Sequence, residues 1–135
     1  MTHSWFILYV ALNAAIVTLL ALNVSRNRIK LRVANGDGGL VEMKAAIRAH
    51  GNAVEHVTIF GFVVLAMSFA SAPDLVLGSL VGLFTLSRLM HATSMLTSAF
   101  NLRRTAAGLM YLAEVVGVVW LLAAWVVAAC AGRVG

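Results

Sequence analysis

Long apolar runs separated by short polar segments form the main pattern along the chain. Each run is close to the length of about 20 residues that one helical crossing of a bilayer requires. The pattern predicts membrane-spanning helices over approximately 5–24, 41–70, 75–100 and 106–131. The second run carries polar side chains in its first half. A helix of that length, at about 1.5 Å per residue, exceeds the hydrocarbon thickness, so its polar half should lie at the membrane surface or beyond it.

The segments between the runs have the composition of turns. Residues 35–39 read Asn-Gly-Asp-Gly-Gly, and residues 71–74 contain the only proline of the chain. Both are strong signals for a chain reversal. We expect the third connection at residues 101–105. Gly78 and Gly82, four residues apart in the third run, indicate close helix packing, either within the chain or between subunits.

Composition agrees with a membrane protein and excludes other classes. The chain has 135 residues, of which 61% are hydrophobic and 11% are charged, whereas about a quarter of a typical soluble domain is charged. The mean hydropathy of +0.94 excludes a disordered chain, which needs low hydrophobicity. A single cysteine, Cys130, excludes a disulfide scaffold. We therefore predict an all-α integral membrane four-helix bundle that forms one domain over residues 1–135.

Basic side chains gather in two of the connections and set the expected orientation. The connection at residues 71–74 has none, and the basic residues of the other two are Arg26, Arg28, Lys30, Arg32, Arg103 and Arg104. Short basic connections face the cytoplasm, so both termini are expected on the non-cytoplasmic side. The same side chains would contact anionic membrane lipids. A second interpretation is that they surround a site for an anionic ligand.

One helix face in the second run combines side chains of opposite charge. At 100° per residue, Arg48, Asn52 and Glu55 fall within about 60° of arc, whereas His50 points away from them. Two interpretations are open. Arg48 and Glu55 could satisfy each other or neighbouring helices, or they could line a site for a ligand that carries both charges.

Ionisable residues also interrupt the third and fourth runs. Arg88 and His91 are three residues apart, and Glu114 lies in the fourth run. A charge at membrane depth usually faces a cavity or a partner charge. Glu114 is therefore the expected partner of Arg88. This pair is either a structural link between helices or part of a functional site.

Together these motifs resemble the MAPEG family, the membrane-associated proteins of eicosanoid and glutathione metabolism. The resemblance rests on Arg48-Ala49-His50-x-Asn52-x-x-Glu55, on Arg88-x-x-His91 and on Arg103-Arg104. In motif it is closest to the branch of microsomal glutathione transferases and membrane prostaglandin E synthases, and it covers essentially the whole chain. It implies a homotrimer that binds glutathione between adjacent subunits near the cytoplasmic side.

The resemblance also implies roles for individual residues. Glu55 would bind the α-amino group of glutathione, Arg48 would bind a carboxylate, and Arg104 would stabilise the thiolate, with Arg103 as the alternative. Thr105 would donate a hydrogen bond to the sulfur. The remaining residues expected to bind glutathione are Arg28, His50, Asn52, Arg88 and His91.

The chemistry of a thiol explains why a cation belongs in such a site. A free thiol ionises near pH 8.5, and only the thiolate is a good nucleophile. A guanidinium and the positive end of a helix both favour the thiolate. The expected function is thus a glutathione-dependent transferase or peroxidase that acts on lipophilic small molecules dissolved in the membrane.

Two departures from the family pattern keep an alternative open. Met95 stands where active members often carry a tyrosine, and Ala53 stands where an acidic residue often follows the motif's asparagine. They favour a non-catalytic protein of the same fold that binds lipid or assists another membrane protein. A small multidrug exporter would need a carboxylate in the first helix, which has none. We expect no metal ion, because the histidines lack ligand spacing, and no nucleic-acid partner.

Overall fold

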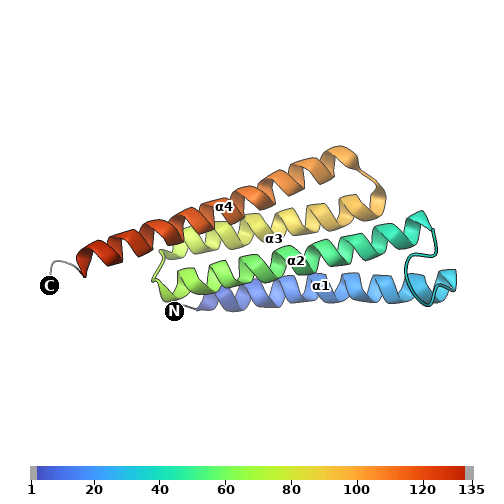
Figure 1. Ribbon diagram of the computed structural model, residues 1–135, viewed down its shortest axis with the longest axis horizontal. Coiled ribbons are helices and arrows are strands. Elements are labelled where there is room, and N and C mark those ends of the chain that lie inside the picture. Colours follow the sequence, from blue (N-terminus) through green and yellow to red (C-terminus); the bar gives the residue numbers. More distant parts are fainter. Residues whose placement is uncertain (1–2, 133–135) are drawn as a thin grey trace.

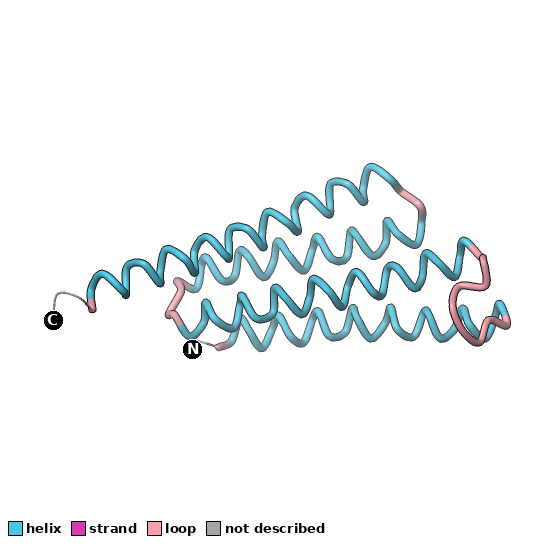
Figure 2. Tube along the Cα trace, viewed as in Figure 1, coloured by secondary structure: helices cyan, strands magenta, loops and turns pink. Residues whose placement is uncertain are grey.

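The chain folds into a bundle of long helices that run alternately up and down. The computed structural model describes residues 3–132, and its four helices are α1 (Ser4–Leu31), α2 (Val41–Phe69), α3 (Asp74–Thr97) and α4 (Phe100–Ala131). Figures 1 and 2 show them side by side, with helices and short loops making up the whole described chain. Each helix is long and apolar enough to cross a membrane. The predicted fold class, an all-α membrane four-helix bundle, is confirmed.

The two basic segments, residues 26–32 at the end of α1 and residues 103–104 at the start of α4, lie at the same end of the bundle. Figure 1 shows the α1–α2 and α3–α4 connections at one end, and both termini near the other. The α2–α3 connection, which carries no basic residue, lies at the end of the termini. Which end faces the cytoplasm stays a prediction.

The helices extend beyond the hydrophobic spans where no residue stops them. α1 continues to Leu31, past the predicted limit at residue 24, and ends at Arg32 with a left-handed backbone (φ 55°). Arginine and lysine are good helix formers, and a basic segment can leave the membrane while it remains helical. The predicted turn follows, with positive φ at Gly36, Gly38 and Gly39.

The prediction of a connection at residues 101–105 is wrong. α3 ends at Thr97, because Ser98 adopts a left-handed backbone (φ 59°), and α4 already begins at Phe100. Residues 101–105 form the first turns of α4. They include no glycine or proline, so nothing in them breaks a helix. Their polarity therefore does not indicate a loop.

Aromatic rings from three helices form the centre of the core. Phe60 and Phe84 are stacked with ring centroids 4.2 Å apart, and Tyr9 lies 5.7 Å from both. The Tyr9 hydroxyl donates a 2.7 Å hydrogen bond to the carbonyl oxygen of Val57, so its polar atom is satisfied. These contacts tie α1, α2 and α3 together.

At Gly78 the glycine pair of α3 packs within the chain, whereas a role of Gly82 between subunits stays a prediction. A Cβ at Gly78 would lie 2.8 Å from the Trp5 ring, so this glycine lets α1 and α3 approach within one chain. A Cβ at Gly82 would meet nothing within 4 Å. Of this pair, only Gly78 therefore lets two helices of the same chain pack closely.

α4 packs along one narrow stripe. Its buried residues are Ala106, Met110, Ala113 and Gly117, and among the described helices it contacts α2 and α3 but not α1. Figure 1 shows α4 diverging from the bundle and its last turns projecting beyond the other helices. Most of its surface faces outward.

Candidate functional site

A polar cleft lies near the end of the bundle that carries the two basic segments. Its volume is about 650 Å³, which falls within the about 300–1,000 Å³ typical of small-molecule sites. Three helices contribute to its wall. The lining residues are Ile47, Arg48, Gly51, Asn52, Glu55, His91, Met95 and Arg103.

The predicted face of α2 forms one side of this cleft. Arg48, Asn52 and Glu55 all line it, because their spacing places them on one side of the helix. Within residues 3–132 the ion pairs are Lys30–Glu42 and His56–Glu114, so Arg48 and Glu55 do not neutralise each other. Both charges remain available in the described part of the chain.

The opposite side of the cleft comes from α3 and the start of α4. His91 is 6% exposed, and its Nδ1 atom has no hydrogen-bond partner in the described chain. Met95 also lines the cleft, and Arg103 Nη1 donates to the Met95 sulfur over 3.7 Å. The Arg103 guanidinium lies over the Phe100 ring, 5.3 Å from its centroid. A cation from α4 and the carboxylate of Glu55 thus line the same cleft.

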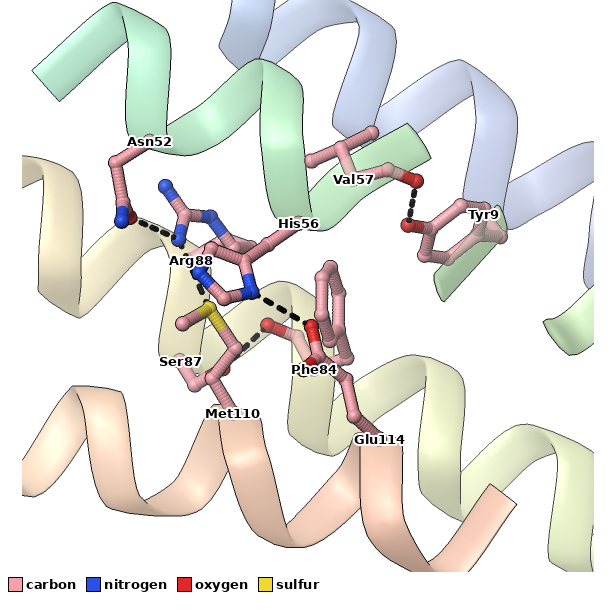
Figure 3. A network of polar contacts seen from close by, with 9 residues as sticks. All are labelled: Tyr9, Asn52, His56, Val57, Phe84, Ser87, Arg88, Met110 and Glu114. Carbon is pink, nitrogen blue, oxygen red and sulfur yellow. Dashed lines mark hydrogen bonds and ion pairs between the residues drawn. The ribbon is translucent and has the colours of Figure 1, made fainter. Parts of the chain in front are cut away.

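Arg88 lies behind the cleft wall and is fully buried. Figure 3 shows its guanidinium between α2 and α4. Its Nη1 donates to Asn52 Oδ1 over 2.9 Å and lies 2.9 Å from Met110 Sδ. Its Nε and Nη2 atoms have no partner in the described chain.

The predicted pair between Arg88 and Glu114 is wrong. Glu114 Oε1 lies 2.8 Å from His56 Nδ1 instead (Figure 3). Arg88 contacts Met110, which is one turn before Glu114 on α4, and its guanidinium is directed to Asn52. On α4, Met110 is therefore the residue that meets Arg88, and Glu114, one turn later, meets His56 of α2.

Sequence reasoning missed the role of His56. Both partners of the His56–Glu114 pair are mostly buried, with side-chain exposures of 14% and 18%, and the Tyr111 ring meets the His56 ring at 5.5 Å between centroids. The available signal was an ionisable residue beside apolar neighbours in each of two spans, which calls for a partner. The pair links α2 to α4.

The other predicted ligand-binding residues lie outside this cleft. Arg104 and Thr105 are exposed on α4, and His50 is half-buried on α2. The Arg28 guanidinium donates to the carbonyl oxygens of Val33, Ala34 and Gly36, so it organises the α1–α2 connection. Their contacts with glutathione stay a prediction.

No metal site is visible in the described residues. Residues 3–132 contain no group of three or more His, Cys, Asp or Glu side chains that could hold a metal ion. The side chains that line the cleft offer guanidinium, carboxylate, amide, imidazole and thioether groups.

Comparisons with known proteins agree with this architecture. The MAPEG family model matches residues 6–130, which include parts of all four helices. The inner membrane protein YecN of Escherichia coli (strain K12) is 37% identical over 99 residues, which are 73% of this chain and 75% of that protein. YecN of Escherichia coli O6:H1 (strain CFT073) matches with the same identity and coverage. The chain is thus a multi-pass membrane protein, and it belongs to the MAPEG family.

Proposed function

We propose that the protein binds glutathione in the polar cleft and directs its thiolate at lipophilic electrophiles, as a transferase or a peroxidase. The observation that carries this proposal is the α2 wall of the cleft, where Arg48 and Glu55 are unpaired within the described chain. A ligand that carries a carboxylate and an ammonium group complements such a wall. Glutathione is a ligand of this kind.

The spacing of the two charges suits a tripeptide. Arg48 and Glu55 are seven residues apart on α2, which corresponds to about 10 Å along the helix axis. Three extended residues span about the same distance. The Arg48 guanidinium offers forked donors for a carboxylate, and the Glu55 carboxylate suits the α-ammonium group. Both ends of the peptide would then be held on one helix.

The sulfur would lie toward the start of α4. Arg103 lines the cleft of its own chain and lies in the first turns of α4, where the helix N-terminus adds positive partial charge. The family resemblance favours Arg104, with Thr105 beside it. Neither of them lines this cleft, and in the expected homotrimer they would serve the cleft of a neighbouring subunit.

The membrane supplies the second reactant. A lipophilic electrophile would reach the sulfur laterally from the bilayer. In a transfer, the thiolate forms a bond to an electrophilic carbon, and the leaving group or the opened ring takes the electron pair. In peroxide reduction, two glutathione molecules become a disulfide while the hydroperoxide becomes an alcohol and water. The proposed orientation places the cleft near the cytoplasm and both termini on the opposite side.

Calorimetric titration of glutathione into the detergent-purified protein tests the binding site. Arg48→Ala and Glu55→Ala should each weaken binding by about 10-fold or more, because each removes a hydrogen bond to a charged group. Lys44→Ala is the control, since Lys44 is exposed one turn earlier on α2 and does not line the cleft. No binding to the parent protein at millimolar glutathione, or an equal loss in the control, would overturn the proposal.

The ultraviolet band of the thiolate tests its activation. If Arg103 acts within its own chain, Arg103→Ala should abolish the band while Arg104→Ala preserves it. The reverse result would identify Arg104, and with it a site shared between subunits. The detergent-corrected mass should be that of three chains.

A second candidate function has one observation in its favour. Met95 lines the cleft at the position where the resemblance leads one to expect a tyrosine, so this wall offers a thioether and no hydroxyl. A non-catalytic protein that binds glutathione or lipid fits this wall. Glutathione binding without a thiolate band, and without turnover of an activated aryl halide or a lipid hydroperoxide, would favour this candidate.

A further inference from the structure

Arg88 is a buried cation that does not line the cleft but contacts a residue that does. It is the largest side chain that is fully buried in the described chain. A guanidinium at membrane depth is costly, so its position calls for an explanation. Glu114 is 2.8 Å from His56, and Arg88 donates to the side-chain oxygen of Asn52 instead of to a carboxylate.

The chemistry of this hydrogen bond determines how the Asn52 amide is turned. A guanidinium has only donors, so Asn52 must present its Oδ1 to Arg88. Its amino group then points away from Arg88. Asn52 lines the cleft, and within residues 3–132 its side chain makes a hydrogen bond only through Oδ1, to Arg88, so its Nδ2 atom has no partner in the protein. The amino group is therefore a free donor at the cleft wall.

We infer that Arg88 is a positioning residue that turns the Asn52 amide so that the cleft offers a hydrogen-bond donor to a carbonyl group of the bound peptide. This inference rests on the proposed binding of glutathione. Asn52 lies between Arg48 and Glu55 on the same face of α2, so it meets the middle of a peptide whose two ends those residues hold. The middle of a peptide presents amide carbonyl oxygens, which accept the donor that Asn52 offers.

A purely structural role for Arg88 makes different predictions. Arg88 also contacts Met110, and it could act only as a link between α2, α3 and α4. A structural link would lower stability and affinity together when removed. Positioning lowers affinity without lowering stability, because an apolar side chain of similar volume relieves the cost of burying Arg88 Nε and Nη2, which have no partner in the described chain.

Three variants separate the two roles. Arg88→Met removes the donor and should weaken glutathione binding by about 10-fold while the melting temperature is kept or rises. Arg88→Lys keeps a donor and should recover at least half of the lost affinity on a logarithmic scale. Asn52→Asp still accepts from Arg88 but has no donor for the cleft, so it should lose at least as much affinity as Arg88→Met.

The matched control is Ser87→Ala. Ser87 is fully buried beside Arg88, but its hydroxyl donates to the Phe84 carbonyl of its own helix and has no contact with Asn52. Glutathione affinity should be unchanged in this variant. An equal loss of affinity in Ser87→Ala and Arg88→Met would overturn the inference.

A readout without glutathione separates this inference from the proposed function. In the parent protein labelled with ¹⁵N, the two side-chain amide protons of Asn52 should give distinct signals that exchange with water. In Arg88→Met the amide should rotate faster, so the two signals should broaden and approach each other. This change supports positioning even if the parent protein binds no glutathione, in which case only the proposed function fails. Unchanged Asn52 signals in Arg88→Met, or a parallel fall of stability and affinity that Arg88→Lys does not reverse, would overturn positioning.

Discussion

Gly117 of α4 packs directly against α2, and its replacement tests how the two helices are held together. A Cβ at position 117 would lie 2.6 Å from Val63 Cγ1 and 3.6 Å from Phe60 Cε2. Val63 is branched and buried, so it cannot turn aside easily. Such overpacking costs about 1–3 kcal/mol, whereas the exchange of a helical glycine for alanine gains about 1 kcal/mol. Gly117→Ala should therefore lower the free energy of unfolding by up to about 2 kcal/mol.

Gly108→Ala is the matched control on the same helix. A Cβ at Gly108 would meet nothing within 4 Å, so this variant shows the gain in helix propensity alone. The difference between the two variants isolates the steric cost of about 1–3 kcal/mol. Unfolding in mixed micelles with increasing dodecyl sulfate, followed by far-ultraviolet circular dichroism, measures both.

Val63→Ala should rescue the Gly117 variant. The double variant removes the methyl group that the new Cβ would strike, so its stability should exceed the sum of the single effects by about 0.5–3 kcal/mol. Equal stability of Gly117→Ala and Gly108→Ala, or strict additivity in the double variant, would refute the packing argument.

Three further predictions concern polar contacts. Glu114→Leu leaves His56 without its partner and should cost about 1–3 kcal/mol in the same unfolding assay, and no loss would contradict a link between α2 and α4. A double-mutant cycle on Asn13 and Thr85, joined by a 2.9 Å hydrogen bond, should give a coupling of about 0.6 kcal/mol, as is usual between membrane helices; zero coupling would contradict the bond. Arg28→Ala should speed amide exchange in the α1–α2 connection, because it removes the hydrogen bonds to the carbonyl oxygens there, and unchanged exchange would contradict this role.

Hydrophobic patterning predicted how many helices there are better than where they end. The apolar runs mark the residues that lie within hydrocarbon, because a polar side chain there is costly. They do not mark where the backbone stops being helical. α1 continues to Leu31 through basic residues, and α4 begins at Phe100 before the arginine pair. Those limits depend on the left-handed residues Arg32 and Ser98, which no hydropathy pattern reveals.

The α2 wall of the site could be predicted because it depends on one helix alone. The spacing of Arg48, Asn52 and Glu55 places them together whatever the helix packs against. The far wall could not be predicted in this way. Which of two adjacent arginines enters the cleft depends on the rotation of α4 about its axis, and the packing of Ala106 and Met110 against the bundle sets that rotation.

The amino-acid sequence by itself determined that this chain forms a bundle of membrane helices with one charged face on the second, because the side-chain periods of a helix and the cost of charge in lipid act locally. Only the tertiary structure decided which charges meet. Glu114 contacts His56, Arg88 contacts Asn52, and Arg103 lines the cleft. These contacts join residues from different helices, so their geometry follows from how far each helix is shifted and rotated against its neighbours. Side-chain volumes across the whole core set those shifts, and no single segment of the chain contains that information.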